Sequence, residues 1–155
     1  MSLSSFRRRA WAVAFTGLPF AVFKGLYGFT LMEMGMEMGA SAADGEPSWL
    51  HLAGRVVLWW AVADAVLNLL ALVFPQRVSY CVLSMIGRGI GARAENLGLA
   101  VDTLLSFLVV SIMIGAGYIA GLPTSLGWAW NLAVIANVMA VGVERVWLAL
   151  RTESS

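Results

Sequence analysis

The stretch LAGRVVLWWAVADAVLNLLALVF, residues 52–74, is apolar over a length that can cross a lipid bilayer as one α-helix. A helix needs roughly 20 mostly apolar residues to span the hydrocarbon core. Pro75 follows directly, and because its ring cannot continue a helix, we expect the helix to end at Phe74. Asp64 lies near the middle of the stretch, and Asn68 follows it by about one helical turn. The sequence therefore predicts a spanning helix with a carboxylate near the centre of the bilayer.

Three further stretches meet the same length test, at residues 10–31, 97–121 and 126–150. Of the 155 residues, 60% belong to the hydrophobic set and only 12% are charged. Soluble domains usually carry about 25% charged residues. A chain of this length cannot bury so much apolar surface in one core, so the excess must face lipid. We expect residues 1–155 to form a single domain, an all-α integral membrane protein built as a bundle of four transmembrane helices.

The basic residues are distributed unevenly between the ends of the predicted helices. They precede the first span, separate the second from the third and follow the fourth: Arg7, Arg8, Arg9, Arg77, Arg88, Arg93 and Arg151. The loop at 32–51 holds acidic residues and has no lysine or arginine. Cytoplasmic loops are enriched in lysine and arginine. We therefore expect both termini on the cytoplasmic side of a membrane, and we assign that membrane to the bacterial inner membrane.

The connection between the second and third spans contains an apolar run, residues 78–86, that is too short to cross a bilayer. We expect this run to form a short interfacial helix on the cytoplasmic leaflet, with neighbouring arginines close to lipid phosphates. A re-entrant segment is the alternative, and it would require protein groups to satisfy its broken backbone.

Ionisable side chains inside the predicted spans need a partner or a role, because each costs at least about 2.5–3.5 kcal/mol to insert. Lys24 is the only lysine of the chain and lies in the first span. We expect it to reach Asp64 if the first two helices are neighbours. Asn68 lies four residues after Asp64, on the same helical face, and is expected to join this group.

A second group of charges is predicted closer to the cytoplasmic side. Asp102 lies a turn or two into the third span, and Glu144 and Arg145 lie at a similar depth in the fourth. We expect Arg145 to neutralise Asp102 across a helix interface. Counting Arg55, three basic residues then face three acidic ones, which favours structural pairing. The alternative is a proton or ion path through both groups, which a shared polar cavity would favour.

The first span runs into LMEMGMEMGA, residues 31–40, where Met-Glu-Met-Gly occurs twice in succession. Thioethers are soft ligands that suit Cu(I), so one hypothesis is periplasmic copper capture by the four methionines: Met32, Met34, Met36 and Met38. The hypothesis we favour is a helix that continues past the membrane. Its flexible methionines would then form a docking surface for a partner or for lipid.

Small residues indicate where helices can approach each other closely. Gly117 and Gly121 are four residues apart in the third predicted span. This small-xxx-small spacing is typical of membrane helices in contact. We expect these two glycines to face another helix or a partner.

No catalytic motif indicates an enzyme. Cys81 and His51 are the only cysteine and histidine, which excludes an internal disulfide and any Cys-pair zinc or iron–sulfur site. The net charge of +1 gives no sign of nucleic-acid binding. We expect an accessory or assembly subunit of a larger membrane complex, with lipids and other subunits as partners and no cofactor. The alternatives are a small ion- or proton-coupled transporter or channel that acts as a homo-oligomer, and Cu(I) handling.

Overall fold

The computed structural model describes residues 9–41, 48–74 and 77–152, with side chains described as far as residue 143. Within these ranges the chain is helical and has no strand. Four helices are long and apolar enough to cross a membrane: Arg9–Ala40, Trp49–Val73, Ala92–Gly115 and Thr124–Val143. The predicted helical class and the four membrane-length helices are confirmed.

The first long helix contains an irregular turn before it becomes a regular α-helix. The π-helix η1 spans Val13–Gly17, and α2 spans Leu18–Ala40. Pro19 lies in the first turn of α2 and has no backbone N–H, so the carbonyl four residues before it has no α-helical partner. In the wider π turn, the Leu18 N–H donates to the Val13 carbonyl, five residues back. Such turns are rare in proteins overall, and those that occur are often found at functional sites.

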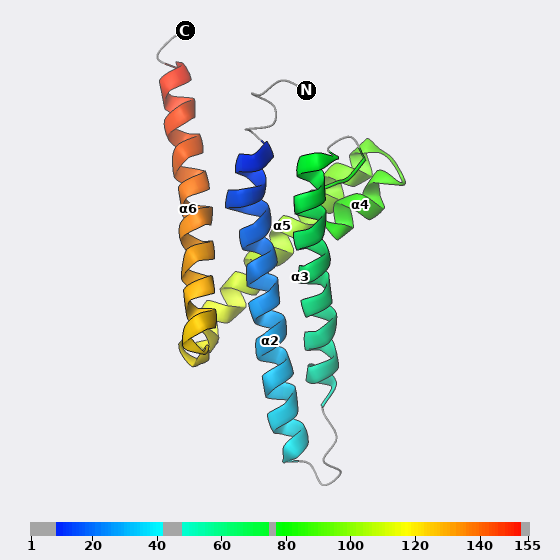
Figure 1. The fold of residues 1–155 in the computed structure, drawn as a ribbon, viewed down its shortest axis with the longest axis vertical. Helices are drawn as coiled ribbons and strands as arrows, with labels where there is room; N and C mark the ends of the chain where they lie inside the picture. Colours follow the sequence, from blue (N-terminus) through cyan, green and yellow to red (C-terminus); the bar gives the residue numbers. More distant parts are fainter. Residues whose placement is uncertain (1–8, 42–47, 75–76, 153–155) are drawn as a thin grey trace.

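α2 is the central helix of the fold (Figure 1). α3 (Trp49–Val73) and α6 (Thr124–Thr152) lie along opposite sides of α2, and α5 (Ala92–Gly115) crosses at a steep angle. The main apolar core lies between α2, α5 and α6 and includes Phe20, Phe23, Met113 and Trp130. Large apolar side chains on the outward faces of α3, α5 and α6 stay exposed. Exposed apolar faces of this kind are those that lipid covers in a membrane.

α2 and α3 approach each other at glycines. A Cβ on Gly28 would lie 2.8 Å from the carbonyl oxygen of Gly54, and a Cβ on Gly54 would lie 2.5 Å from that of Gly28. Gly35 has the same relation to the backbone of His51. These three glycines therefore set the close contact between the two helices, as small residues do in membrane proteins.

The third long helix differs from the prediction at both ends. α5 begins at Ala92 rather than at 97 and ends at Gly115 rather than at 121. Gly117 has a φ of 73°, a left-handed conformation that ends the helix, and the 3₁₀-helix η2 (Tyr118–Gly121) follows. A Cβ on Gly117 or Gly121 would meet nothing within 4 Å. Neither glycine therefore packs closely against another helix in the described part of this chain, and contact with a partner stays a prediction.

The connection after α3 turns back along that helix, and the short helix α4 (Val82–Arg88) follows it. Asn68 Nδ2 donates to the Tyr80 carbonyl at 2.8 Å, and the Val82 N–H donates to Asp64 Oδ1 at 2.7 Å. We call residues 77–81 of this connection the returning segment. Asp64 is nine residues before the end of α3, so the returning segment leads roughly 13 Å back along that helix. The short helix expected between the second and third spans is present, but it begins at Val82 rather than at 78, because a non-helical stretch precedes it and polar side chains of α3 satisfy the backbone of that stretch. Its position at a membrane interface stays a prediction.

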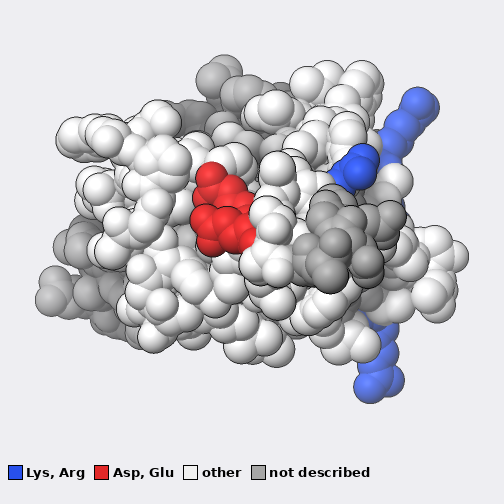
Figure 2. Space-filling model, turned by 90° about the horizontal axis from the view of Figure 1, so that it is seen from below, with Lys and Arg blue, Asp and Glu red and all other residues white. Residues whose placement is uncertain are grey.

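The two ends of the molecule differ in charge. The end of α3, α4 and the start of α5 lie at the same end as the last turns of α6, and the tip of the α2–α3 hairpin lies at the other (Figure 1). Figure 2 looks onto the hairpin end and shows acidic side chains gathered there, where Glu33 and Glu37 of α2 are exposed. Arg77, Arg88 and Arg93 belong to the opposite end. The charge asymmetry of the sequence is thus an asymmetry of the folded molecule.

Candidate functional site

The charged centre of the molecule is Lys24, whose ammonium group lies between two aspartates. Nζ is 2.5 Å from Asp64 Oδ2 and 2.6 Å from Asp102 Oδ1. Lys24 and Asp64 are each 2% exposed, and Asp102 is 5% exposed. Nζ also lies 4.7 Å from the centre of the Trp60 ring, within cation–π distance. The ammonium group is therefore enclosed by groups from three helices, α2, α3 and α5.

The two aspartates are held differently. Asp64 accepts a hydrogen bond from Lys24 on Oδ2 and another from the Val82 N–H on Oδ1. The Asp102 carboxylate accepts from Lys24, while the nearby Ser106 hydroxyl donates to the Asp102 backbone carbonyl at 2.8 Å. One ammonium group thus faces two carboxylates. When both are ionised, this triad of Lys24, Asp64 and Asp102 carries one surplus negative charge.

The Lys24–Asp64 contact predicted from the sequence is present, but Asp102 belongs to the same cluster and not to a second group. The contact that we expected from Arg145 stays a prediction, and the described partner of Asp102 is Lys24. The reason is the path of α5, which begins five residues earlier than predicted and crosses the fold, bringing Asp102 level with Lys24. The side chains of Glu144 and Arg145 lie outside the described residues.

Asn68 links α3 to the returning segment and leaves one acceptor unused. Its Nδ2 donates to the Asp64 carbonyl at 2.9 Å and to the Tyr80 carbonyl at 2.8 Å. Because both partners are carbonyls, the network fixes which end of the amide is nitrogen. The remaining atom, Oδ1, lies against Gly17 of the π turn, is buried, and has no hydrogen-bond partner among the described residues. A buried acceptor without a donor costs about 1–3 kcal/mol.

Lys24 lies between two cavities. The first has a volume of about 200 Å³, and its lining includes the triad, Asn68 and, near the start of the first helix, Thr16. The second has a volume of about 240 Å³ and is lined by Lys24 together with Tyr27, Trp60, Leu108 and other apolar residues. On each of α2, α3 and α5, the residues that line the second cavity lie one to three helical turns closer to the hairpin end than those that line the first. The triad therefore separates a cavity on the α4 side from a cavity on the hairpin side.

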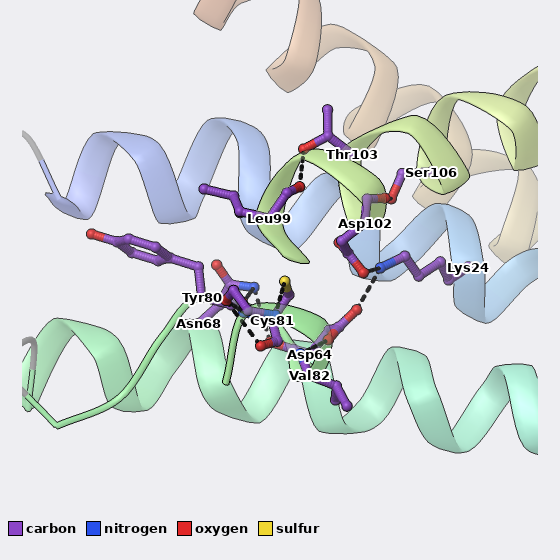
Figure 3. Close-up of polar contacts among 11 residues, drawn as sticks. Lys24, Asp64, Asn68, Tyr80, Cys81, Val82, Leu99, Asp102, Thr103 and Ser106 are labelled. Carbon is purple, nitrogen blue, oxygen red and sulfur yellow. Dashed lines mark hydrogen bonds and ion pairs between the residues drawn. The ribbon is translucent and has the colours of Figure 1, made fainter. Parts of the chain in front are cut away.

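Figure 3 shows how the first cavity is composed. Asp64, Asn68 and Tyr80 lie on the α3 side, and Leu99 and Asp102 face them from α5. The dashed lines join Lys24 to a carboxylate on each side. The arrangement brings charged groups from both walls to a single ammonium group.

Trp60 is a site residue that the sequence interpretation did not single out. Its ring contacts Lys24 and lines the second cavity. Its Nε1 is buried and has no partner among the described residues. Trp60 lies four residues before Asp64, and this i, i+4 spacing places both side chains on one face of α3. That spacing is the sequence signal that could have identified it.

Cys81 lines the first cavity as a neutral group. It caps α4, since its Sγ accepts from the Ser84 N–H at 3.4 Å while the Ser84 hydroxyl accepts from the Cys81 N–H at 3.3 Å. Burial raises the pKa of the Cys81 thiol above its ordinary value, and the charges of Asp102 and Asp64 raise it further. The thiol therefore adds no charge to the site near neutral pH.

The Met-Glu repeat lies within α2, which continues to Ala40 rather than ending at 31. Helical spacing places Met32 with Met36 on one face and Met34 with Met38 on another. Met36 and Met38 are exposed, whereas the other two are half-buried. The four thioethers therefore do not converge on one point within the chain, and Cu(I) binding stays a prediction.

No protein-family model, curated protein or solved structure matches the chain. A helical membrane-length fold by itself is compatible with many functions. The features of this chain that bear on function are the triad, its two cavities and the unpaired Oδ1 of Asn68.

Proposed function

We propose that the chain is a membrane transport protein that exchanges a monovalent cation for a proton at the triad of Lys24, Asp64 and Asp102. The observation that carries this proposal is a charge imbalance within the described part of the chain, where one buried ammonium group faces two buried carboxylates. An uncompensated buried charge costs several kcal/mol. The surplus negative charge therefore has to be neutralised, by a proton or by a cation bound beside the triad.

Competition for one carboxylate would produce the exchange. Because the Asp64 carboxylate accepts from both Lys24 and the Val82 N–H, whereas the Asp102 carboxylate accepts from Lys24, we assign the proton to Asp102. A cation entering the first cavity displaces it: the Asp102 carboxylic acid and the cation yield the Asp102 carboxylate with the cation bound, and one free proton. Since a single neutralising charge is needed, binding of one species is coupled to release of the other.

The two cavities support access to the triad from opposite sides. Transport requires that a cation reach the triad from one side and leave toward the other. Lys24 lines both cavities, and the ring of Trp60 covers its ammonium group on the hairpin side. Movement of Trp60 is therefore the change that would open the triad to the second cavity.

We propose that the protein lies in the bacterial inner membrane with its α4 end on the cytoplasmic side. The support is the arginine distribution, because Arg77, Arg88 and Arg93 belong to the α4 end while exposed Glu33 and Glu37 belong to the hairpin end. The first cavity would then face the cytoplasm and the second would face the periplasm.

The accessory-subunit role expected from the sequence is a second candidate, supported by a different observation. Large apolar side chains on α3, α5 and α6 are exposed, and a neighbouring subunit could cover them as well as lipid could. Purification from the native membrane in mild detergent, with mass spectrometry of co-migrating proteins, separates the candidates. Other subunits in fixed stoichiometry would support the accessory role, and a chain found alone or as a homo-oligomer would argue against it.

Proton release from purified protein tests the exchange. Protein in weakly buffered detergent solution with a pH-sensitive dye receives sodium, potassium or methylammonium chloride. We expect at least one of these cations to release about one proton per chain, as the linkage requires. Asp102→Asn keeps an acceptor for Lys24 and removes the surplus charge, so it should release none. Glu33→Gln removes an exposed carboxylate of α2 and should behave as the unmodified protein does.

Release that is absent with all three cations would overturn the exchange. Release that persists in Asp102→Asn would overturn the assignment of the proton to Asp102.

A further inference from the structure

The first cavity offers hydrogen-bond acceptors and apolar walls together. Asn68 is 2% exposed, and its Oδ1 has no partner although both of its Nδ2 protons are used. The carboxylates of Asp64 and Asp102 line the same cavity. The donor nearest these carboxylates, the Lys24 ammonium group, already bonds to both of them. A ligand that brings N–H groups would therefore satisfy the amide oxygen that the described residues leave unpaired.

The walls and the volume of this cavity limit the size of the ligand. At roughly 30 Å³ per water, a cavity of about 200 Å³ holds on the order of seven waters. Phe20, Leu99 and Ala12 contribute apolar surface, and Tyr80 contributes an aromatic side chain. Apolar and aromatic surface beside a carboxylate is suited to an organic cation, which has an alkyl part as well as a charge.

We propose that the first cavity binds a small protonated primary amine, with its ammonium group between the Asp102 carboxylate and Asn68 Oδ1 and its alkyl part against Phe20 and Leu99. This assignment rests on the proposed exchange, because the amine is the cation that replaces the proton of Asp102. A primary ammonium group supplies three N–H donors, so it can bond to the carboxylate and to the unpaired amide oxygen at once. A quaternary ammonium ion has no N–H and leaves Oδ1 unsatisfied.

Alkali ions fit the same cavity less well. Hard cations bind through shells of oxygen ligands, and they are held by sites in which such oxygens converge. Much of the lining here is apolar, and the described residues contain no group of three or more metal-ligating acids, cysteines or histidines. The amine is therefore the monovalent cation that matches both the charge and the walls.

Equilibrium dialysis of radiolabelled methylammonium against the purified full chain in detergent tests this proposal. We expect saturable binding that ethylammonium competes for more strongly, through its larger alkyl part. Tetramethylammonium should compete at least about tenfold more weakly because it has no N–H donor for the amide oxygen, and sodium and potassium should do so because the largely apolar lining offers them few oxygen ligands. Binding should be lost in Asp102→Asn.

Two substitutions alter the cavity without changing its charge. Gly17→Ala places a Cβ against Asn68 Oδ1 and displaces the acceptor, and Leu99→Trp fills apolar space in the cavity. Each should weaken methylammonium binding at least about tenfold. Gly142→Ala, where a Cβ meets nothing within 4 Å, and Leu104→Trp, on the 68%-exposed Leu104 position of α5, are the matched controls and should bind as the unmodified protein does. Helix content and elution volume establish that every variant is folded.

The outcomes distinguish the two proposals. If potassium or sodium competes as well as ethylammonium, or if both cavity variants bind methylammonium normally, the amine assignment is wrong while cation–proton exchange stands. If no cation binds and none releases a proton, both proposals are wrong.

Discussion

Replacing Lys24 with methionine tests whether the ammonium group is what allows two carboxylates to be buried together. Lys24→Met keeps most of the side-chain volume and leaves Asp64 facing Asp102, both almost fully buried, without a counter-charge. Removing one partner of a buried ion pair costs about 3–5 kcal/mol. One of the two carboxylates can take up a proton, and Asp64 keeps its bond from the Val82 N–H. We therefore expect a loss at the lower end of that range, about 3 kcal/mol near neutral pH.

The stability of Lys24→Met should depend on pH with a defined sign. In the folded variant a proton is held between the two aspartates, whereas in the unfolded chain both aspartates are ionised at neutral pH. The folded state then binds more protons than the unfolded state, so the stability of the variant rises as pH falls. The stability of Lys24→Met itself should accordingly be higher at mildly acidic pH than at neutral pH.

A matched set of variants separates charge from packing. The combination of Lys24→Met with Asp64→Asn and Asp102→Asn removes all three charges and should recover most of the lost stability, because no buried charge is left uncompensated. Arg55→Met removes a basic side chain from an exposed position on α3 and should change stability by less than about 0.5 kcal/mol.

The measurement is the free energy of unfolding in mixed micelles, followed by helical circular dichroism as a denaturing detergent is titrated in. A Lys24→Met variant as stable as Arg55→Met would refute the reasoning, and so would a triple variant no more stable than Lys24→Met alone.

The remaining predictions concern helix packing, the single cysteine and the ring that covers Lys24. Gly54→Ala should cost about 1–3 kcal/mol in the same unfolding assay, because its Cβ would lie 2.5 Å from the Gly28 carbonyl oxygen. An equal effect from Gly142→Ala, where nothing lies within 4 Å, would contradict the close helix contact. Cys81 should react with a maleimide at least about tenfold more slowly in native protein than in denatured protein, because burial shields it and raises its pKa; equal rates would show that the returning segment is open. Trp60→Phe keeps a ring over the ammonium group and removes the unpaired Nε1. The free energy of unfolding should therefore be unchanged or higher by up to about 1 kcal/mol. A decrease of more than about 1 kcal/mol would show that Nε1 has a hydrogen-bond partner.

Much of the architecture follows from the length and composition of the apolar stretches. The second span was predicted to within a few residues because Pro75 sets its end and the run before it is uniformly apolar. The end of the third was wrong because Ile119 and its neighbours continue the apolar pattern, while Gly117 adopts a left-handed conformation that stops the helix. Hydropathy reports whether a segment prefers lipid and carries no information on backbone conformation at a glycine.

The sequence predicted one of the two ion pairs in the candidate site, the contact between Lys24 and Asp64, and missed the contact between Lys24 and Asp102. Lys24 and Asp64 were matched because each lies deep in its span and the two helices are consecutive in the chain. Asp102 was assigned to another depth because a sequence does not report helix tilt, and the crossing of α5 decides which residues share a level. The unpaired oxygen of Asn68 depends on the returning segment, whose path is set by side-chain bonds far apart in the sequence.

The choice between structural pairing and transport depends on which charges meet. Counting the ionisable residues of the predicted spans matches three bases with three acids, which favours pairing. In the folded chain, Lys24 serves both Asp64 and Asp102, and Arg55 is exposed on α3. One lysine and one aspartate would suffice to orient the helices, and a second buried carboxylate that has no second base among the described side chains adds a desolvation cost to the fold. That cost has a function if the extra carboxylate binds a cation or proton reversibly. The cavity beside it, where Asn68 Oδ1 has no hydrogen-bond partner among the described residues, gives that cation a place to bind.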